Sequence, residues 1–204
     1  HELAIQSPDA AKGDSFGNSI SLSGDMLVVG SHFSDPDGLD NAGAAYLFQI
    51  NKGTANHIKT ILSPAPGDDG RFGESVSLQD GLLLVGAFQE DQDGKANAGA
   101  VHMYQVQSKV RVNFLETFTA PTPAENAYFG THVAQQDGTL LLAAPVASPP
   151  GKDSAGAVYI FLSSDVNSIS AGAVADSGFC TPALSHLCPS TCTGAQMSGQ
   201  HAVA

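Results

Sequence analysis

The chain has 204 residues, of which 42% are hydrophobic and 14% are charged, against about a quarter charged in a typical soluble domain. No apolar run reaches the roughly 18 residues of a membrane-spanning helix, so we expect no membrane span in this chain. The formal net charge of −12 argues against nucleic-acid binding and favours metal cations or basic partners. The chain begins at His1 rather than Met, as a processed or excised fragment would.

Two sequence landmarks recur with one period and divide the chain into three copies of a unit. A Phe-Gly pair and a Gly-Ala pair each return after 56 and then 57 residues. Two independent landmarks with the same spacing indicate an internal repeat. The signature residues of the repeat are Phe16, Gly17, Phe72, Gly73, Phe129, Gly130, Gly43, Gly99 and Gly156.

Each unit is predicted to hold four short strands. In the first copy, residues 16–22 alternate between apolar and polar side chains, and Gly24-Asp25 forms a two-residue turn. Residues 26–29 are continuously apolar, as in a strand buried on both faces, and residues 44–49 alternate again. Residues 57–62 form an outer strand that ends before a proline. The later copies repeat this order, with strands at 82–85, 100–105 and 114–119, and at 140–142 and 157–162.

Four antiparallel strands in each unit of 56 or 57 residues are typical of a propeller blade. We therefore predict an all-β fold, a partial β-propeller of three blades with an irregular, Cys-containing tail. The three Phe-Gly phenylalanines should be buried between neighbouring blades. Three blades are fewer than the usual four to eight, so the chain is either an arc of a longer propeller or one of several chains that share a ring. The predicted divisions are residues 1–15 (outer strand of a preceding blade and linker), 16–71, 72–128 and 129–162 (incomplete blade), and 163–204 (linker and tail).

At these residues the chain resembles the FG-GAP repeat family of integrin α-subunit-like β-propellers. The "FG" part is the Phe-Gly pair of each copy, and the "GAP" part is degenerate, most visibly at Ala143-Ala144-Pro145. The resemblance covers residues 1–162. It implies an extracellular or cell-surface binding or adhesion module with no enzymatic activity.

The three cysteines of the chain lie within its last 25 residues, at Cys180, Cys188 and Cys192. Their spacing does not match the usual zinc sites. They are disulfide candidates and favour an extracellular location, or they are three unrelated thiols.

Acidic residues gather in the loops between second and third strands and in the loops between blades, which by topology share one face. Thirteen acids and four basic residues fall on this face. Alternate aspartates on a Gly-bearing turn can supply oxygen ligands to Ca²⁺, and the candidates are Asp35, Asp37, Asp40, Asp91 and Asp93. The alternative is that both loops are solvated turns. The family's own calcium loop lies between strands one and two, where this chain has a two-residue turn, so those sites are not carried over.

The predicted function is a non-enzymatic module that makes protein–protein or protein–glycan contacts through the acidic face. Its partners would be a protein or glycan, of basic character where it contacts the acidic face, and further blades in the parent chain or in neighbouring subunits. Two alternatives stay open: a building unit of an extracellular filament or sheath, and an accessory domain of a secreted hydrolase. No cofactor is expected apart from Ca²⁺.

Overall fold

The computed structural model describes residues 4–108, 111–149 and 151–162. The cysteine predictions at Cys180, Cys188 and Cys192 and the predicted linker and tail at 163–204 lie outside the described residues. Within the described residues, no helix has the length and apolar character needed to cross a bilayer.

Three antiparallel sheets follow one another along the chain, two of four strands and one of three. Each sheet keeps its strands in chain order, so each is an up-and-down meander, and we call the sheets blades 1, 2 and 3. The fold is therefore the predicted all-β arrangement of propeller blades. The one helix of the described part is a single 3₁₀ turn, η1 (Pro36–Gly38). The strands are β1 (Ser19–Ser23), β2 (Met26–Ser31), β3 (Ala44–Asn51) and β4 (Thr54–Ile61) in blade 1, β5 (Phe72–Gln79), β6 (Leu82–Ala87), β7 (Ala100–Ser108) and β8 (Arg111–Phe118) in blade 2, and β9 (His132–Gln136), β10 (Thr139–Ala144) and β11 (Ala157–Leu162) in blade 3.

The first hairpin of every blade closes with a two-residue turn, as predicted. In blade 1, Ser23 pairs with Met26, which leaves only two residues between the strands, and the register is the same in the other blades. The turns place a residue at positive φ, 60° at Gly24, 49° at Asp80 and 47° at Asp137. Gly and Asp tolerate this conformation, which matches the twist of the paired strands.

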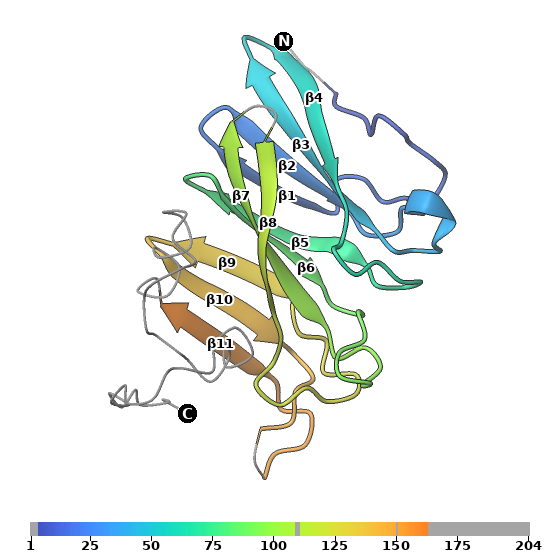
Figure 1. The fold of residues 1–204 in the computed structure, drawn as a ribbon, viewed down its shortest axis with the longest axis vertical. Helices are drawn as coiled ribbons and strands as arrows, with labels where there is room; N and C mark the ends of the chain where they lie inside the picture. The colour runs from blue at the N-terminus through green and yellow to red at the C-terminus, as the bar shows by residue number, and fades with distance from the viewer. Residues whose placement is uncertain (1–3, 109–110, 150, 163–204) are drawn as a thin grey trace, which may run out of the picture.

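The blades stack face to face in chain order (Figure 1), with β5 lying across β1 and β2, and β9 across β5. Each junction between blades encloses one apolar cluster. We call the side of a blade that faces the preceding blade its front face and the other side its back face. At the first junction the back face of blade 1 supplies Val28 and Leu47, and the front face of blade 2 supplies Val76 and Leu78. In the central blade, the second strand β6 is continuously apolar because this blade is covered on both sides.

Each junction brings two backbones into direct contact through a glycine. A Cβ atom on Gly30 would overlap the carbonyl oxygen of Gly73 in the next blade, and the same relation holds between Gly86 and Gly130. The same carbonyl oxygen accepts a hydrogen bond from a serine that pairs across the sheet with the first glycine. Ser19 Oγ donates to Gly73 O at 2.8 Å, and Ser75 Oγ donates to Gly130 O at 2.8 Å. At both junctions, the Phe-Gly turn of one blade therefore packs against a glycine and a serine that pair across the sheet of the preceding blade.

The burial predicted for the three Phe-Gly phenylalanines is correct at two positions and wrong at one. The rings of Phe72 and Phe129 are fully buried, each at a junction between blades. Phe16 is only half-buried, because it lies on the front face of blade 1, which no described blade covers. Its ring packs edge-on against Tyr46 and Phe48, with centroids 5.5 and 6.0 Å away.

Residues 1–8 are predicted as an outer strand, and of these the described residues 4–8 form no strand. In blades 1 and 2 the outer strand pairs with the third strand of its own sheet. Residues 4–8 instead lie on blade 1, where Ile5 packs against the cluster that contains Val29 and Tyr46.

Candidate binding face

The loop between β2 and β3 lies directly beside the loop that joins blade 1 to blade 2. The Asp40 N–H donates to Asp68 Oδ1 at 3.0 Å, and the Asp69 N–H donates to the Asp40 carbonyl at 2.7 Å. The Asn41 amide also donates to Asp69 Oδ1, at 2.9 Å. These contacts hold exposed carboxylates from two loops in one continuous surface.

The second junction repeats this arrangement. The Asn126 N–H donates to the Ala96 carbonyl at 2.9 Å, and the Asn97 amide donates to Asn126 Oδ1 at 2.9 Å. The loops of neighbouring blades are thus joined along one side of the stack, as the topology predicts. We call this side, formed by residues 34–41, 67–71, 89–97, 124–128, 148–149 and 151–154, the acidic loop face.

The face is less negative than the sequence predicts, because some of its acids are used inside the fold. Asp14 is buried and accepts a hydrogen bond from the Ala11 N–H at 2.7 Å. Glu90 is also buried, and Glu74 lies half-buried 3.5 Å from the His32 ring. The acids predicted for this face that are exposed are Asp9, Asp35, Asp37, Asp40, Asp68, Asp69, Asp91, Asp93, Glu125 and Asp153.

The exposed acids are not spread evenly over the three blades. The first junction has five carboxylates, and its nearest cation, Arg71, bonds to Asp69 at 3.3 Å and lies 4.2 Å over the Phe33 ring. The second junction has three acids beside Lys95, and the loop of blade 3 has one beside Lys152. The negative potential is therefore strongest where blades 1 and 2 meet.

The first aspartate of each acidic loop has a structural role. Asp35 Oδ1 accepts a hydrogen bond from the Asn41 N–H at 2.7 Å, and Asp91 Oδ1 accepts one from the Asn97 N–H at 3.0 Å. In blade 3, Ser148 Oγ does the same for the N–H six residues later, at 2.9 Å. A side-chain oxygen at this position closes the loop in all three blades.

The calcium prediction stays a prediction. Asp35, Asp37, Asp40, Asp91 and Asp93 are all exposed, and one oxygen each of Asp35 and Asp91 is already bonded to a backbone N–H. The described residues contain no group of three or more His, Cys, Asp or Glu side chains arranged to hold a metal ion.

A comparison with protein-family models identifies the repeat. The model of the FG-GAP repeat matches residues 2–48, 62–104 and 113–161, and each match includes the first two strands and most of the third strand of one blade. The chain belongs to the FG-GAP repeat family. Repeats of this family are in general extracellular protein-interaction modules and are typically non-enzymatic. No curated protein matches the chain significantly.

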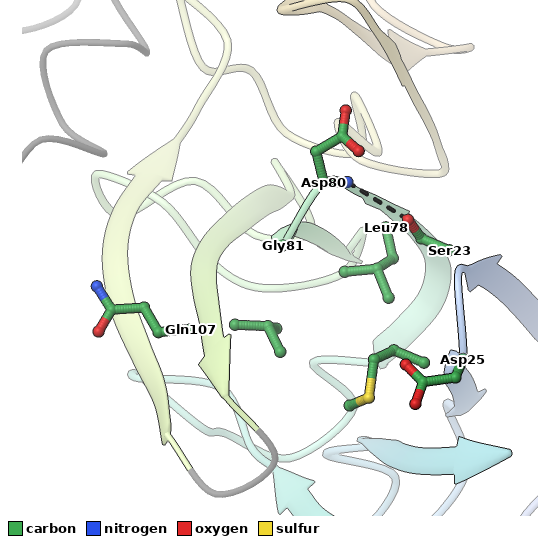
Figure 2. Close-up of a pocket in the computed structure, with 8 residues that line it drawn as sticks. Ser23, Asp25, Leu78, Asp80, Gly81 and Gln107 are labelled. Atoms are coloured by element: carbon green, nitrogen blue, oxygen red, sulfur yellow. Dashed lines mark hydrogen bonds between the residues drawn. The ribbon is translucent and has the colours of Figure 1, made fainter. Parts of the chain in front are cut away.

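A pocket of about 330 Å³ lies between the first two FG-GAP blades, on the side of the two-residue turns. Asp25 accepts a hydrogen bond from Gln49 at 2.6 Å, and the Asp80 N–H donates to Ser23 Oγ at 3.4 Å. Figure 2 shows the Asp80 carboxyl group and the Gln107 amide pointing away from Leu78. Polar groups do not converge in this pocket, so it does not resemble a small-molecule site. The lining residues are Ser23, Asp25, Met26, Leu78, Asp80, Gly81, Val106 and Gln107.

A buried polar network, which the sequence patterns did not predict, joins the first FG-GAP blade to the second. Glu90 accepts hydrogen bonds from the Ser63 hydroxyl and from His102 Nε2, the latter at 2.8 Å. His102 Nδ1 lies 2.9 Å from the Thr117 hydroxyl, within hydrogen-bonding distance. Buried polar groups need such partners, so the network fixes the end of one blade against the next.

The same three positions change together from blade to blade, which is the signal that could have revealed the network. Blade 2 has Ser63, Glu90 and His102, whereas the equivalent positions in blade 3 are Ala120, Ala147 and Tyr159. In blade 1 they are Ser7, Ser34 and Tyr46. Tyr46, which occupies the position of His102 in blade 1, is buried, and burial raises the pKa of its hydroxyl to about 12. A large acid is paired with histidine, and a small residue is paired with tyrosine.

We expect Glu90→Ala to lower the free energy of unfolding by about 1–3 kcal/mol, because Ser63 and His102 would stay buried without their acceptor. The triple variant Ser63→Ala/Glu90→Ala/His102→Tyr reproduces the set found in blade 3 and should recover much of this loss. Urea denaturation of both variants checks the prediction. Equal stability of the single and the triple variant would contradict it.

Proposed function

We propose that the chain is a non-enzymatic binding module whose acidic loop face contacts a basic segment of a partner protein. The observation that carries the proposal is the hydrogen-bonded contact between the loop at Asp40 and the loop at Asp68 and Asp69. It holds carboxylates from two blades in fixed positions, so a cationic partner would meet a preorganised surface. An extracellular or cell-surface location fits this role and is part of the proposal.

The experiment compares two triple variants that remove the same charge from opposite sides of the stack. Asp37→Asn/Asp93→Asn/Glu125→Gln neutralises acids of the acidic loop face for which no hydrogen bond is shown. Asp25→Asn/Asp80→Asn/Asp137→Asn neutralises the hairpin turns on the other side, and asparagine tolerates the positive φ found at Asp80 and Asp137. The probe is a ten-residue oligolysine peptide, and the readout is its affinity at low and at moderate salt.

We expect the loop-face variant to bind the peptide at least about tenfold more weakly than wild-type chain, and the hairpin variant to bind as wild type. The difference should shrink at higher salt, because exposed charges are screened. Equal losses in the two variants would mean that only net charge matters, and the acidic loop face would no longer be supported as the binding face.

A second candidate function, a building unit that stacks with other blades, is supported by a separate observation. Both ends of the stack expose apolar side chains, with Ile20 and Leu22 on blade 1 and Val158 and Ile160 on blade 3. Large apolar patches on a surface mark sites of association.

The calcium proposal makes its own prediction, on the loops of Asp35 and Asp91. Affinity for Ca²⁺ should be highest in the first loop, lower in the second and absent in the loop of blade 3, in the order of their acids. Bound Ca²⁺ should also raise the melting temperature, because it binds only the native state. Calorimetric titration of wild-type chain and of Asp35→Asn/Asp37→Asn checks this, and equal heats would leave both loops as ordinary turns.

A further inference from the structure

A buried histidine with an unsatisfied ring nitrogen lies where blade 1 meets blade 2. His32 follows β2 and is 8% exposed, and its Nδ1 atom lies 3.5 Å from Glu74 Oε2 of β5 in the next blade. This contact forms no hydrogen bond, and Nδ1 is buried without any hydrogen-bond partner. His102, which is also buried, has a hydrogen-bonding group beside each ring nitrogen. His32 is therefore the histidine whose environment is incomplete.

A permanent positive charge lies beside this histidine. The Arg71 guanidinium lies 4.2 Å over the Phe33 ring, and the His32 ring packs on the same phenylalanine, with centroids 4.0 Å apart. Arg71 also bonds to Asp69 at 3.3 Å, and its Nε atom is buried without a hydrogen-bond partner. A proton on His32 would therefore place a second positive charge close to a cation that its neighbours hold in position.

The surroundings of His32 oppose its protonation. Burial disfavours the charged ring most strongly, Glu74 favours it, and Arg71 disfavours it, so the pKa of His32 lies below its ordinary value of 6.5. The loop before β1 also contacts this segment, through the Asp14 carbonyl, which accepts a hydrogen bond from the Phe33 N–H at 3.3 Å. The Asp14 carboxylate instead bonds to the N–H of Ala11. Glu74 and Arg71 are thus the charged groups that act on the ring.

The second junction differs at all three positions of this cluster. The equivalents of the histidine, the arginine and the glutamate carry uncharged side chains there, namely Phe88, Tyr128 and Thr131. The Phe88 and Tyr128 rings pack against each other with centroids 5.7 Å apart. The two junctions therefore share their backbone geometry and differ in whether a titratable group is buried at this point.

We propose that the cluster of His32, Arg71 and Glu74 makes the first junction a pH-sensitive joint, which loosens in mild acid when His32 takes up a proton. In an open joint the ring would be in water and would bind a proton at higher pH than in the closed joint, so falling pH favours opening. The loops that would separate are joined by the Arg71 N–H, which donates to the Asn41 carbonyl at 3.1 Å. The inference goes beyond the proposed function, because the joint would respond to pH without any ligand.

The test compares hydrogen exchange of two equivalent amides in the whole chain, at about pH 7 and at about pH 5.5, which is above the range where ordinary carboxylates titrate. The Arg71 N–H reports on the first junction. The Tyr128 N–H, which donates to the Asn97 carbonyl at 3.2 Å, reports on the second. Each rate is divided by the rate of the free amide at the same pH, so that the resulting protection measures opening alone.

We expect mild acid to reduce the protection of the Arg71 amide at least about threefold more than that of the Tyr128 amide. His32→Phe, which introduces the residue that blade 2 has at this position, should remove the difference between the amides. His132→Ser, which replaces an exposed histidine of blade 3, should preserve it. Equal changes at the two amides of wild-type chain, or a His32→Phe chain that keeps the difference, would overturn the proposal.

An NMR titration of the His32 ring in wild-type chain provides a second measurement, which needs no variant to fold. The ring should titrate with a midpoint below 6.5, because protonation is favoured in water and opposed in the closed joint. A midpoint at or above this value would overturn the proposal, whatever the behaviour of His32→Phe.

Discussion

Phe72→Ala should lower the free energy of unfolding by roughly 3–5 kcal/mol, as expected for removal of a fully buried aromatic ring. The Phe72 ring lies at the junction of blades 1 and 2, with its centroid 5.7 Å from that of His102 and 6.2 Å from that of Tyr104. Its loss would leave a cavity lined by side chains of both blades, and neither backbone is free to close it because Gly43 and Phe72 form a bridge. Urea denaturation followed by circular dichroism measures the change.

Phe16→Ala is the matched control, since it removes the same ring from the equivalent position. Phe16 is half-buried, so its replacement should cost clearly less than that of Phe72. Phe129, which is buried like Phe72, should behave like Phe72. Equal losses of unfolding free energy at all three positions would contradict the interpretation that the loss depends on the junction between blades rather than on the ring alone.

Gly86→Ala should destabilise the chain by about 3 kcal/mol or more, although it adds one methyl group. Gly86 lies in β6 without a positive φ, so alanine has no conformational penalty there and would even reduce the entropy of the unfolded chain. The loss would come from overlap with the Gly130 carbonyl, which would force blades 2 and 3 apart and break the Ser75 hydrogen bond.

Gly67→Ala provides the control for this prediction. Gly67 also has no positive φ, and no atom lies within 4 Å of the position that its Cβ would take. Its replacement should leave the melting temperature nearly unchanged. If the Gly86→Ala chain had the same melting temperature as the Gly67→Ala chain, the junctions would relax more easily than their geometry indicates.

The sequence predicts the fold well because each feature of the repeat occurs in three copies. The two-residue turns, the apolar second strands and the Phe-Gly positions recur at one spacing, so each copy supports the assignment of the others. The family match at residues 2–48, 62–104 and 113–161 agrees with that interpretation.

What distinguishes one copy from another was harder to predict. The loop position of Glu90 predicts a surface acid, yet the residue is buried, because it bonds to Ser63 and His102, which lie 27 and 12 residues away in the sequence. Phe16 was expected to be buried because its equivalents are, yet burial is a property of the neighbouring blade. The close contacts of Gly30 and Gly86 with the backbone of the next blade likewise depend on the packing of two blades, which no single repeat encodes.

The packing of the blades against one another also determines where the native chain opens first. Each blade touches only its neighbours, so unfolding can proceed from either end of the stack, as in other repeat proteins. Blade 2 contributes to both apolar clusters that join the blades, whereas blades 1 and 3 each contribute to one of them. The backbone amides of β6 should therefore exchange with deuterium most slowly, and those of β1 and β11 should exchange by fraying, at a lower free energy than global unfolding.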